Sequence, residues 1–260
     1  MARARENDLD IISITDHDTY KGFFEAREAG DELGVKVLPG SEITSNYLGR
    51  ETHLLAYCFD VASPELKSML HRHKLARINR ARWIIGKLRK QGLELDIEEV
   101  VAEAGRGNVG RPHIAEVLVR KGYVGDHREA FMRYLSDQML GKIKSNYATY
   151  EEVIDTVKRA GGATVLAHPG LTYTDEDLQR FVKAGIDGIE YLHPSHNYEL
   201  QQHYQQFAED HNLLATGGSD FHGSRNQNYP NFGIIAISKT RVDSLVRMTT
   251  TRKKLSSSHQ

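Results

Sequence analysis

The chain has 260 residues and a mass of 29.4 kDa, enough for one large α/β barrel or two ordinary domains. Its single cysteine, Cys58, excludes an internal disulfide and a thiolate-rich zinc site, so a metal site here would have to use His, Asp and Glu. No apolar run reaches the ~18 residues of a membrane span and the first residues lack the apolar stretch of a signal peptide, so we expect a cytoplasmic protein. The formal net charge is −1, yet residues 67–147 carry 17 Lys and Arg against 9 Asp and Glu.

Short apolar segments with an ionisable residue at or near one end recur along the chain, and they alternate with predicted helices such as 22–33 and 151–160. The predicted strands and their polar residues, in chain order, are 11–15 with His17, 35–38 with Glu42, 53–57 with His53, 163–167 with His168, 188–192 with His193 and His196, and 213–216 with Asp220 and His222. This alternation predicts parallel βα units, in which polar groups gather at one rim of a barrel or sheet. A further strand is expected over 234–237.

Residues 66–147 lack this alternation of strands and helices. They are predicted to form a basic helical insert in a discontinuous barrel made of 1–65 and 148–248. The predicted helices of the insert are 66–91, 96–104, 111–121 and 126–140. Between Leu66 and Leu93 there are nine Lys and Arg and no acidic residue. That run is typical either of a solvated helix face or of an anion-binding surface. The polar tail, 249–260, is expected to fray.

Six residues form the candidate metal site because a barrel would bring their strand ends to one rim. They are His17, Glu42, His53, His168, Asp220 and His222. Imidazoles and carboxylates without thiolates suit Zn²⁺, Mn²⁺ or Fe²⁺. More than four ligands indicate more than one ion, a site suited to hydrolysis of phosphate esters because the cations acidify water and neutralise phosphoryl charge. The alternative for any one of these histidines is a structural role.

Two further groups carry candidate substrate contacts. Arg111 and His113 open a predicted helix after a glycine-rich stretch, and the guanidinium fork matches a phosphate; a helix cap with incidental charge is the alternative. His193 and His196 fit either a layer that supports the metal ligands or a contact with the leaving group.

The motifs Ile14–Thr19, Pro39–Ile43, His53–Tyr57, Leu166–Gly170 and Gly218–Gly223 together resemble the PHP (polymerase and histidinol phosphatase) superfamily. The resemblance implies a distorted (β/α)₇ barrel with a trinuclear metal site. Because the candidate ligands offer nitrogen and oxygen donors without thiolate, we expect Mn²⁺, with Fe²⁺ or Zn²⁺ as alternatives. It implies that Glu42 bridges two ions, that His53 and His168 complete one, that Asp220 serves another, and that His17 and His222 hold the third. Asp220, His222 and His196 would form the catalytic set, Arg111 and His113 would bind the substrate phosphate, and His193 or His196 would line the pocket.

The insert with Arg111-Pro112-His113 is similar to the subgroup of nucleoside 3′,5′-bisphosphate phosphatases and RNA 5′-end exonucleases. The resemblance therefore implies a metal-dependent phosphoesterase that uses a metal-activated water on a small phosphorylated nucleoside or on the 5′ end of short RNA, with no stable DNA complex and no membrane partner. Alternatives are a phosphatase for another metabolite, such as histidinol phosphate, and a catalytically impaired barrel that only binds nucleotide.

One departure from the family concerns the first strand, which in the family carries His-x-His and a nearby Asp. The first predicted strand of this chain corresponds to the family's second. We therefore expect the natural protein to begin upstream, with roughly 20–30 further residues for one strand and most of a helix. The alternative is a degenerate relative with an incomplete site.

Overall fold

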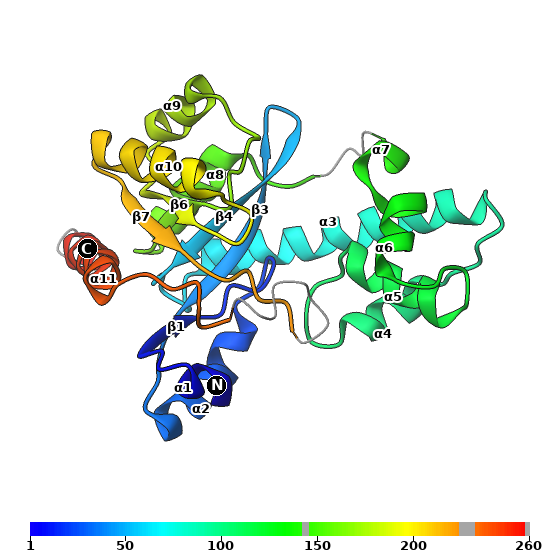
Figure 1. Cartoon of the computed structure of the whole chain (residues 1–260), viewed down its shortest axis with the longest axis horizontal. Helices are drawn as coiled ribbons and strands as arrows, with labels where there is room; N and C mark the ends of the chain where they lie inside the picture. Colours follow the sequence, from blue (N-terminus) through cyan, green and yellow to red (C-terminus); the bar gives the residue numbers. More distant parts are fainter. Residues whose placement is uncertain (142–145, 224–231, 258–260) are drawn as a thin grey trace. The chain divides into compact units, whose positions relative to one another are not determined.

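The computed structural model describes residues 1–141, 146–223 and 232–257, and the chain divides into two compact units. Met1–Lys67 with Ala148–Gln260 is called the sheet unit here, and Ser68–Tyr147 the helical unit. Figure 1 labels their elements along the chain. No helix within the described ranges is long and apolar enough to cross a membrane.

The sheet unit begins with a short helix and a parallel βα unit. The elements are α1 (Ala2–Glu6), β1 (Ile11–Ser13), α2 (Lys21–Leu33) and β2 (Lys36–Leu38). β1 and β2 pair in parallel with Ile12 opposite Val37. Helix α2 ends because Gly34 adopts φ 70°, the left-handed conformation that glycine tolerates best. The predicted strand–helix–strand order is confirmed here.

The remaining strands form a mixed five-stranded sheet in chain order. They are β3 (Gly40–Tyr47), β4 (Arg50–Tyr57), β5 (Ala163–Leu166), β6 (Gly188–Leu192) and β7 (Leu214–Gly217). β5, β6 and β7 are parallel, as predicted, but β4 pairs antiparallel with both β3 and β5. The expectation of uniformly parallel units is therefore wrong for this half, because Leu48 and Gly49, at φ 50° and 85°, make a two-residue hairpin turn. Residues 234–237 form turn and irregular structure, so the strand expected there is also wrong.

Four helices of the sheet unit alternate with these strands along the chain, one after each of β4, β5, β6 and β7. They are α8 (Tyr150–Arg159), α9 (Asp175–Lys183), α10 (Tyr198–Asp210) and α11 (Lys239–Ser257). Figure 1 shows α8, α9 and α10 around the sheet, where α10 contacts β6 and β7, and α8 contacts β3, β4 and β5. The tail expected to fray is instead the second half of α11 up to Ser257. Arg252 anchors it by donating two hydrogen bonds to the buried Asp187 carboxylate, at 2.6 and 3.0 Å; 258–260 lie outside the described residues.

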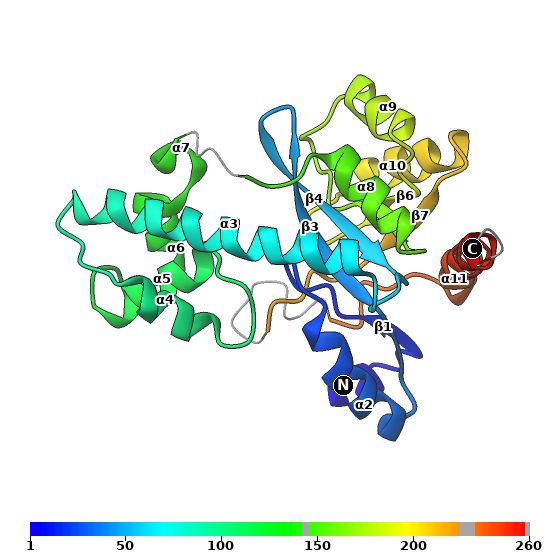
Figure 2. The same ribbon diagram turned by 180° about the vertical axis from the view of Figure 1, so that it is seen from behind.

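The helical unit packs several helices around one apolar core, and Figure 2 shows them beside the long helix α3. The elements are α3 (Pro64–Arg89), whose first turn belongs to the sheet unit, α4 (Ile97–Ala104), α5 (Arg111–Arg120), α6 (His127–Ala130), the π-helix η1 (Phe131–Leu135) and α7 (Asp137–Leu140). The helix expected over 126–140 is broken, because Ser136 is extended at φ −68°, ψ 157° and its hydroxyl caps α7.

Candidate functional site

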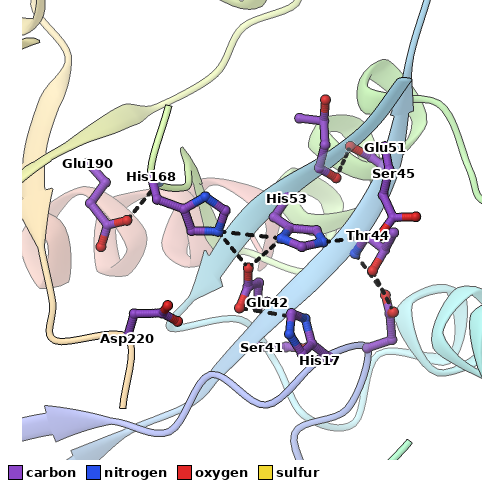
Figure 3. A network of polar contacts seen from close by, with 12 residues as sticks. His17, Ser41, Glu42, Thr44, Ser45, Glu51, His53, His168, Glu190 and Asp220 are labelled. Atoms are coloured by element: carbon purple, nitrogen blue, oxygen red, sulfur yellow. Dashed lines mark hydrogen bonds and ion pairs between the residues drawn. The ribbon is translucent and has the colours of Figure 1, made fainter. Parts of the chain in front are cut away.

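The Glu42 carboxylate lies at the centre of a cluster of three histidines in the sheet unit (Figure 3). Glu42 is the third residue of β3 and is only 5% exposed. Its Oε1 lies 2.8 Å from His53 Nδ1, on the paired strand β4, and 3.1 Å from His168 Nε2, just after β5. Its Oε2 lies 3.6 Å from His17 Nδ1. An isolated parallel bridge between His17 and Glu42 sets this register.

Buried charge fixes the protonation state of the cluster. Burial alone would raise the pKa of Glu42, but the imidazoles of His17 and His53 and hydrogen bonds from His168 and His53 lower that pKa well below its usual value. Burial alone would lower the pKa of His53, but the Glu42 charge and hydrogen bond raise it. The pKa of His168 is raised by the same carboxylate against its own burial. The cluster thus holds a carboxylate and basic imidazoles at one point.

The geometry of the cluster fits a divalent cation. One ligand atom each from His17, Glu42 and His53 lies within 4.8 Å of the others. His53 Nδ1 and His168 Nε2 lie 3.4 Å apart, and both are close to the same Glu42 oxygen. Two imidazole nitrogens at this distance attract each other only when a proton or a cation lies between them. Nitrogen and carboxylate donors in this arrangement are those of non-thiolate divalent metal sites.

Asp18, which sequence reasoning missed, holds His17 in place. Asp18 is 1% exposed and adopts φ 53°. Its Oδ1 accepts a hydrogen bond from the Thr44 N–H and its Oδ2 one from the Thr44 hydroxyl, each at 2.8 Å, and its own N–H donates to the Glu42 carbonyl. The loop that carries His17 is therefore fastened to β3 at Glu42 and at Thr44. The signal in the sequence was the second aspartate of Asp16-His17-Asp18.

Asp220 and His222, after β7, form the other predicted ligand pair. His222 Nδ1 lies 3.4 Å from Asp220 Oδ1, and the His222 ring lies 5.8 Å from that of His17. His193 Nε2 lies 3.7 Å from Asp220 Oδ2, and the His193 ring lies 5.4 Å from that of His168. The structure therefore brings all six predicted ligands and His193 into one neighbourhood.

Glu190 is a second residue that sequence reasoning missed. It lies in the middle of β6, is 4% exposed, and its Oε2 accepts a hydrogen bond from the His168 N–H at 2.8 Å. His168 has φ 28°, a conformation unusual for this residue type, so this bond holds a strained backbone. Burial raises the pKa of Glu190 to about 7, with the neighbouring His193 and His168 acting in the opposite direction. A carboxylate inside the apolar run of 188–192 was the available signal.

His196 supports a loop through both ring nitrogens. Nδ1 is 2.9 Å from the Tyr191 carbonyl, to which it donates, and Nε2 accepts from the Gly170 N–H at 3.1 Å. The side chain is 5% exposed and burial lowers its pKa. These contacts leave no ring nitrogen for a substrate, which does not fit the catalytic and substrate-binding roles expected for His196.

Arg111 and His113 lie in the helical unit, at the first and third residues of α5. Arg111 Nη1 donates to Asp137 Oδ1 at 2.7 Å and to the Leu135 carbonyl at 3.2 Å. His113 Nδ1 accepts from the Gly110 N–H at 2.9 Å, which leaves the proton on Nε2, and burial lowers the pKa of His113. Arg111 also lines a small pocket with other cationic side chains, Arg77 and Arg80.

Comparison with known proteins gives several similar chains, although no family model matches. A 5′-3′ exoribonuclease of Haemophilus influenzae is 33% identical over 226 residues, which cover 85% of this chain and 82% of the relative. A 3′,5′-nucleoside bisphosphate phosphatase of Chromobacterium violaceum is 30% identical over 218 residues, 82% and 76% of the two chains. The solved structure of a protein from Bifidobacterium adolescentis, described as a metal-dependent phosphoesterase, has a TM-score of 0.87 and 32% identity over 95% of this chain and 88% of that one.

Proposed function

Because this chain belongs to the PHP superfamily of metal-dependent phosphoesterases, we propose that it hydrolyses a phosphate ester of a 3′,5′-bisphosphonucleoside or of the 5′ end of a short RNA. The observation that carries the proposal is the buried Glu42 carboxylate with His53 and His168 on one oxygen and His17 on the other. Such a site has no evident structural purpose, since a buried carboxylate among imidazoles is costly unless a function retains it.

The residues that would hold the ions are the six predicted ligands: His17, Glu42, His53, His168, Asp220 and His222. When bound, divalent cations supply a water molecule with a near-neutral pKa and positive charge against the phosphoryl oxygens. We propose Mn²⁺ as the preferred ion, because carboxylate and imidazole donors without thiolate suit it; Fe²⁺ and Zn²⁺ are alternatives.

Within this proposal the supporting side chains keep the ligands at fixed positions. Asp18 fixes His17 through Thr44, and Glu190 fixes the backbone of His168. We propose that His193, whose Nε2 lies 3.7 Å from Asp220 Oδ2, donates a proton to the leaving group. We assign His196 to holding the loop at Gly170, in place of the catalytic and substrate-binding roles expected from the sequence.

Arg111 and His113 remain our candidates for binding a substrate phosphate. Arg111 shares its pocket with Arg77 and Arg80, and three guanidinium groups lining one pocket favour an anion. The tautomer of His113 presents an N–H donor at Nε2. Asp137, which is exposed, holds Arg111 until an anion replaces it.

We also propose that the strands of the sheet unit belong to one distorted (β/α)₇ barrel. The described strands form a two-stranded and a five-stranded sheet. The isolated bridge between His17 and Glu42 connects the chain after β1 to β3, and therefore links the two sheets.

A substrate comparison tests the proposal. Phosphate release by the full chain with Mn²⁺ would be measured on a 3′,5′-bisphosphonucleoside, a 5′-phosphorylated RNA trimer and histidinol phosphate, with Glu42→Gln as the control. We expect the nucleotide substrates to be turned over at least tenfold faster than histidinol phosphate, because Arg111 and its pocket favour a second phosphate. Preference for histidinol phosphate, or equal activity of the control, would contradict the proposal.

A further inference from the structure

The outer face of α3 has a composition that neither the metal cluster nor the Arg111 pocket explains. Its exposed residues recur every three or four positions and so lie along one side of the helix. We call the following set the α3 stripe: Arg72, Leu75, Asn79, Arg82, Trp83 and Lys90. The opposite side, which includes Ile84, Ile85 and Leu88, is buried in the core of the helical unit.

The cations of the α3 stripe differ from several other cations of the helical unit in how they are paired. Within the described part of the chain, Arg72, Arg82 and Lys90 form no ion pair with a carboxylate. Arg72 donates a hydrogen bond to Ser68 and Arg82 donates one to Asn79, both on the same helix. Elsewhere in the helical unit, Arg89, Arg120 and Arg133 are each paired with an acidic residue. The α3 stripe therefore presents three aligned cations to solvent without an acidic partner among the described residues, a positive surface suited to a polyanion.

Trp83 adds an aromatic platform to this positive surface. It is the chain's single tryptophan and is 39% exposed. Lys87 Nζ lies 4.8 Å from the ring centroid and also donates to the Leu140 carbonyl, so the indole is braced by a fixed cation. Leu75, 48% exposed, extends the apolar surface on the same side. Alternating phosphate-binding cations and a stacking ring are the elements by which proteins hold unpaired nucleic acid.

We infer that the α3 stripe binds a single-stranded RNA chain, with Arg72, Arg82 and Lys90 on backbone phosphates and an unpaired base stacked on Trp83. At 1.5 Å per residue, the stripe from Arg72 to Lys90 is ~27 Å long, which exceeds one nucleotide and matches several. The inference rests on the proposed function, because it is the nucleotide chemistry of the metal cluster that selects RNA among polyanions. It assigns the helical unit a role in selecting chain length, separate from the binding of one phosphate at Arg111.

Trp83 itself supplies the direct measurement. Its fluorescence in the full chain would be titrated with a hydrolysis-resistant phosphorothioate RNA of about 12 nucleotides, a length within the range of single-strand binding sites. The same titration would use a 3′,5′-bisphosphonucleoside, an RNA hairpin of equal charge and anionic phospholipid vesicles. We expect strong quenching by the single-stranded RNA alone. Equal quenching by the hairpin, or quenching by vesicles without RNA, would overturn the inference.

Variants separate charge from stacking. Replacing Arg72, Arg82 and Lys90 together with Gln should weaken RNA binding at least tenfold at low salt. The slope of log K against log salt should also fall by about 2, because each phosphate that the protein neutralises adds ~0.7 to that slope. Trp83→Ala, followed by anisotropy of labelled RNA, should weaken binding about tenfold with the slope unchanged. The matched control is Lys74→Gln, which removes an exposed cation from another side of the same helix and should leave the RNA affinity unchanged.

Hydrolysis of the bisphosphonucleoside distinguishes the two proposals. The stripe variants should keep the parent kcat and KM on that substrate, since a single nucleotide does not span the stripe. If the parent chain hydrolyses no nucleotide but still shows RNA-specific quenching at Trp83, the proposed function fails and the α3 stripe stands. If hydrolysis is normal and the stripe variants bind RNA as tightly as Lys74→Gln does, the stripe inference fails alone.

Discussion

The two units of the chain use charge in opposite ways. In the sheet unit, three carboxylates are buried and bonded to neighbouring side chains: Glu42 among imidazoles, Asp18 on Thr44, and Asp187 on Arg252. In the helical unit, which has 16 Lys and Arg against 9 acidic residues, charges lie mainly on helix surfaces around an apolar core. Buried networks depend on geometry, whereas exposed charges add up and are screened by salt. Single substitutions should therefore cause large losses of activity or stability in the sheet unit, and smaller, additive, salt-dependent changes in the helical unit.

The largest effect is expected at Glu42. Glu42→Gln keeps the volume but removes the charge that His17, His53 and His168 share. We expect kcat/KM to fall by about 10³-fold or more, since loss of a central ligand exceeds the 10–100-fold that supporting residues cost. Glu51→Gln, which changes a carboxylate 3.6 Å from His53 Nε2, is the matched control and should cost about tenfold at most. Comparable losses in both variants would mean that Glu42 has no special role.

A smaller effect on a different parameter is expected at Arg111. Arg111→Ala should raise KM for a bisphosphonucleoside and lower kcat/KM by about 10²-fold, with metal content unchanged. Arg111→Lys should recover only part of this, because an ammonium cannot reproduce the planar fork. Steady-state kinetics with elemental analysis measure both quantities. A loss of thermal stability with normal kinetics would instead assign Arg111 to capping α5.

Asp18 should act through His17 alone. Asp18→Ala removes both bonds to Thr44 and should weaken Mn²⁺ binding by about 10–100-fold. Asp18→Asn keeps an acceptor for the Thr44 N–H and tolerates the left-handed conformation, so it should recover most of the affinity. Isothermal titration of the chelator-treated chain provides the affinities. If Ala and Asn at this position behave alike, the hydrogen bonds to Thr44 do not position His17.

No effect on chemistry is expected at Arg252, which stabilises the sheet unit through α11. Arg252→Met leaves the Asp187 carboxylate buried and unpaired, so we expect a loss of about 3 kcal/mol in the free energy of unfolding. Arg159→Met, which breaks an exposed pair with Asp155, should change it by less than about 0.5 kcal/mol. Denaturant titration gives both values. A lowered kcat in the folded Arg252 variant would show that α11 influences the site.

The residues that the structure brings together around Glu42 could be located in the sequence, whereas part of the sheet that carries them could not. His17, Glu42, His53 and His168 could be located because each lies at the end or start of an apolar segment. Strand β3 could not, since its buried residues include Ser41, Glu42, Thr44 and Ser45 and show no alternation of apolar and polar side chains. Burial on both faces removes the period-two signal of a strand.

Supporting contacts were also beyond the sequence, because they join residues far apart in the chain. Asp18 meets Thr44 across 26 positions, and Glu190 meets the His168 backbone across 22. The role of His196 depends on two backbone groups whose positions only the folded loop defines. The break at Ser136, by contrast, left a local signal in the capping pattern that precedes α7.

We propose that the cluster around Glu42 binds the divalent ions that hydrolysis requires. Metal content by elemental analysis and hydrolysis of a 3′,5′-bisphosphonucleoside would be measured on the same samples of the parent chain and of Glu42→Gln, before and after chelation and with Mn²⁺ restored. We predict that activity in the parent falls and returns in proportion to bound metal, and that Glu42→Gln neither binds the metal nor recovers activity. Undiminished hydrolysis in excess chelator, or a full complement of metal in Glu42→Gln, would contradict the account.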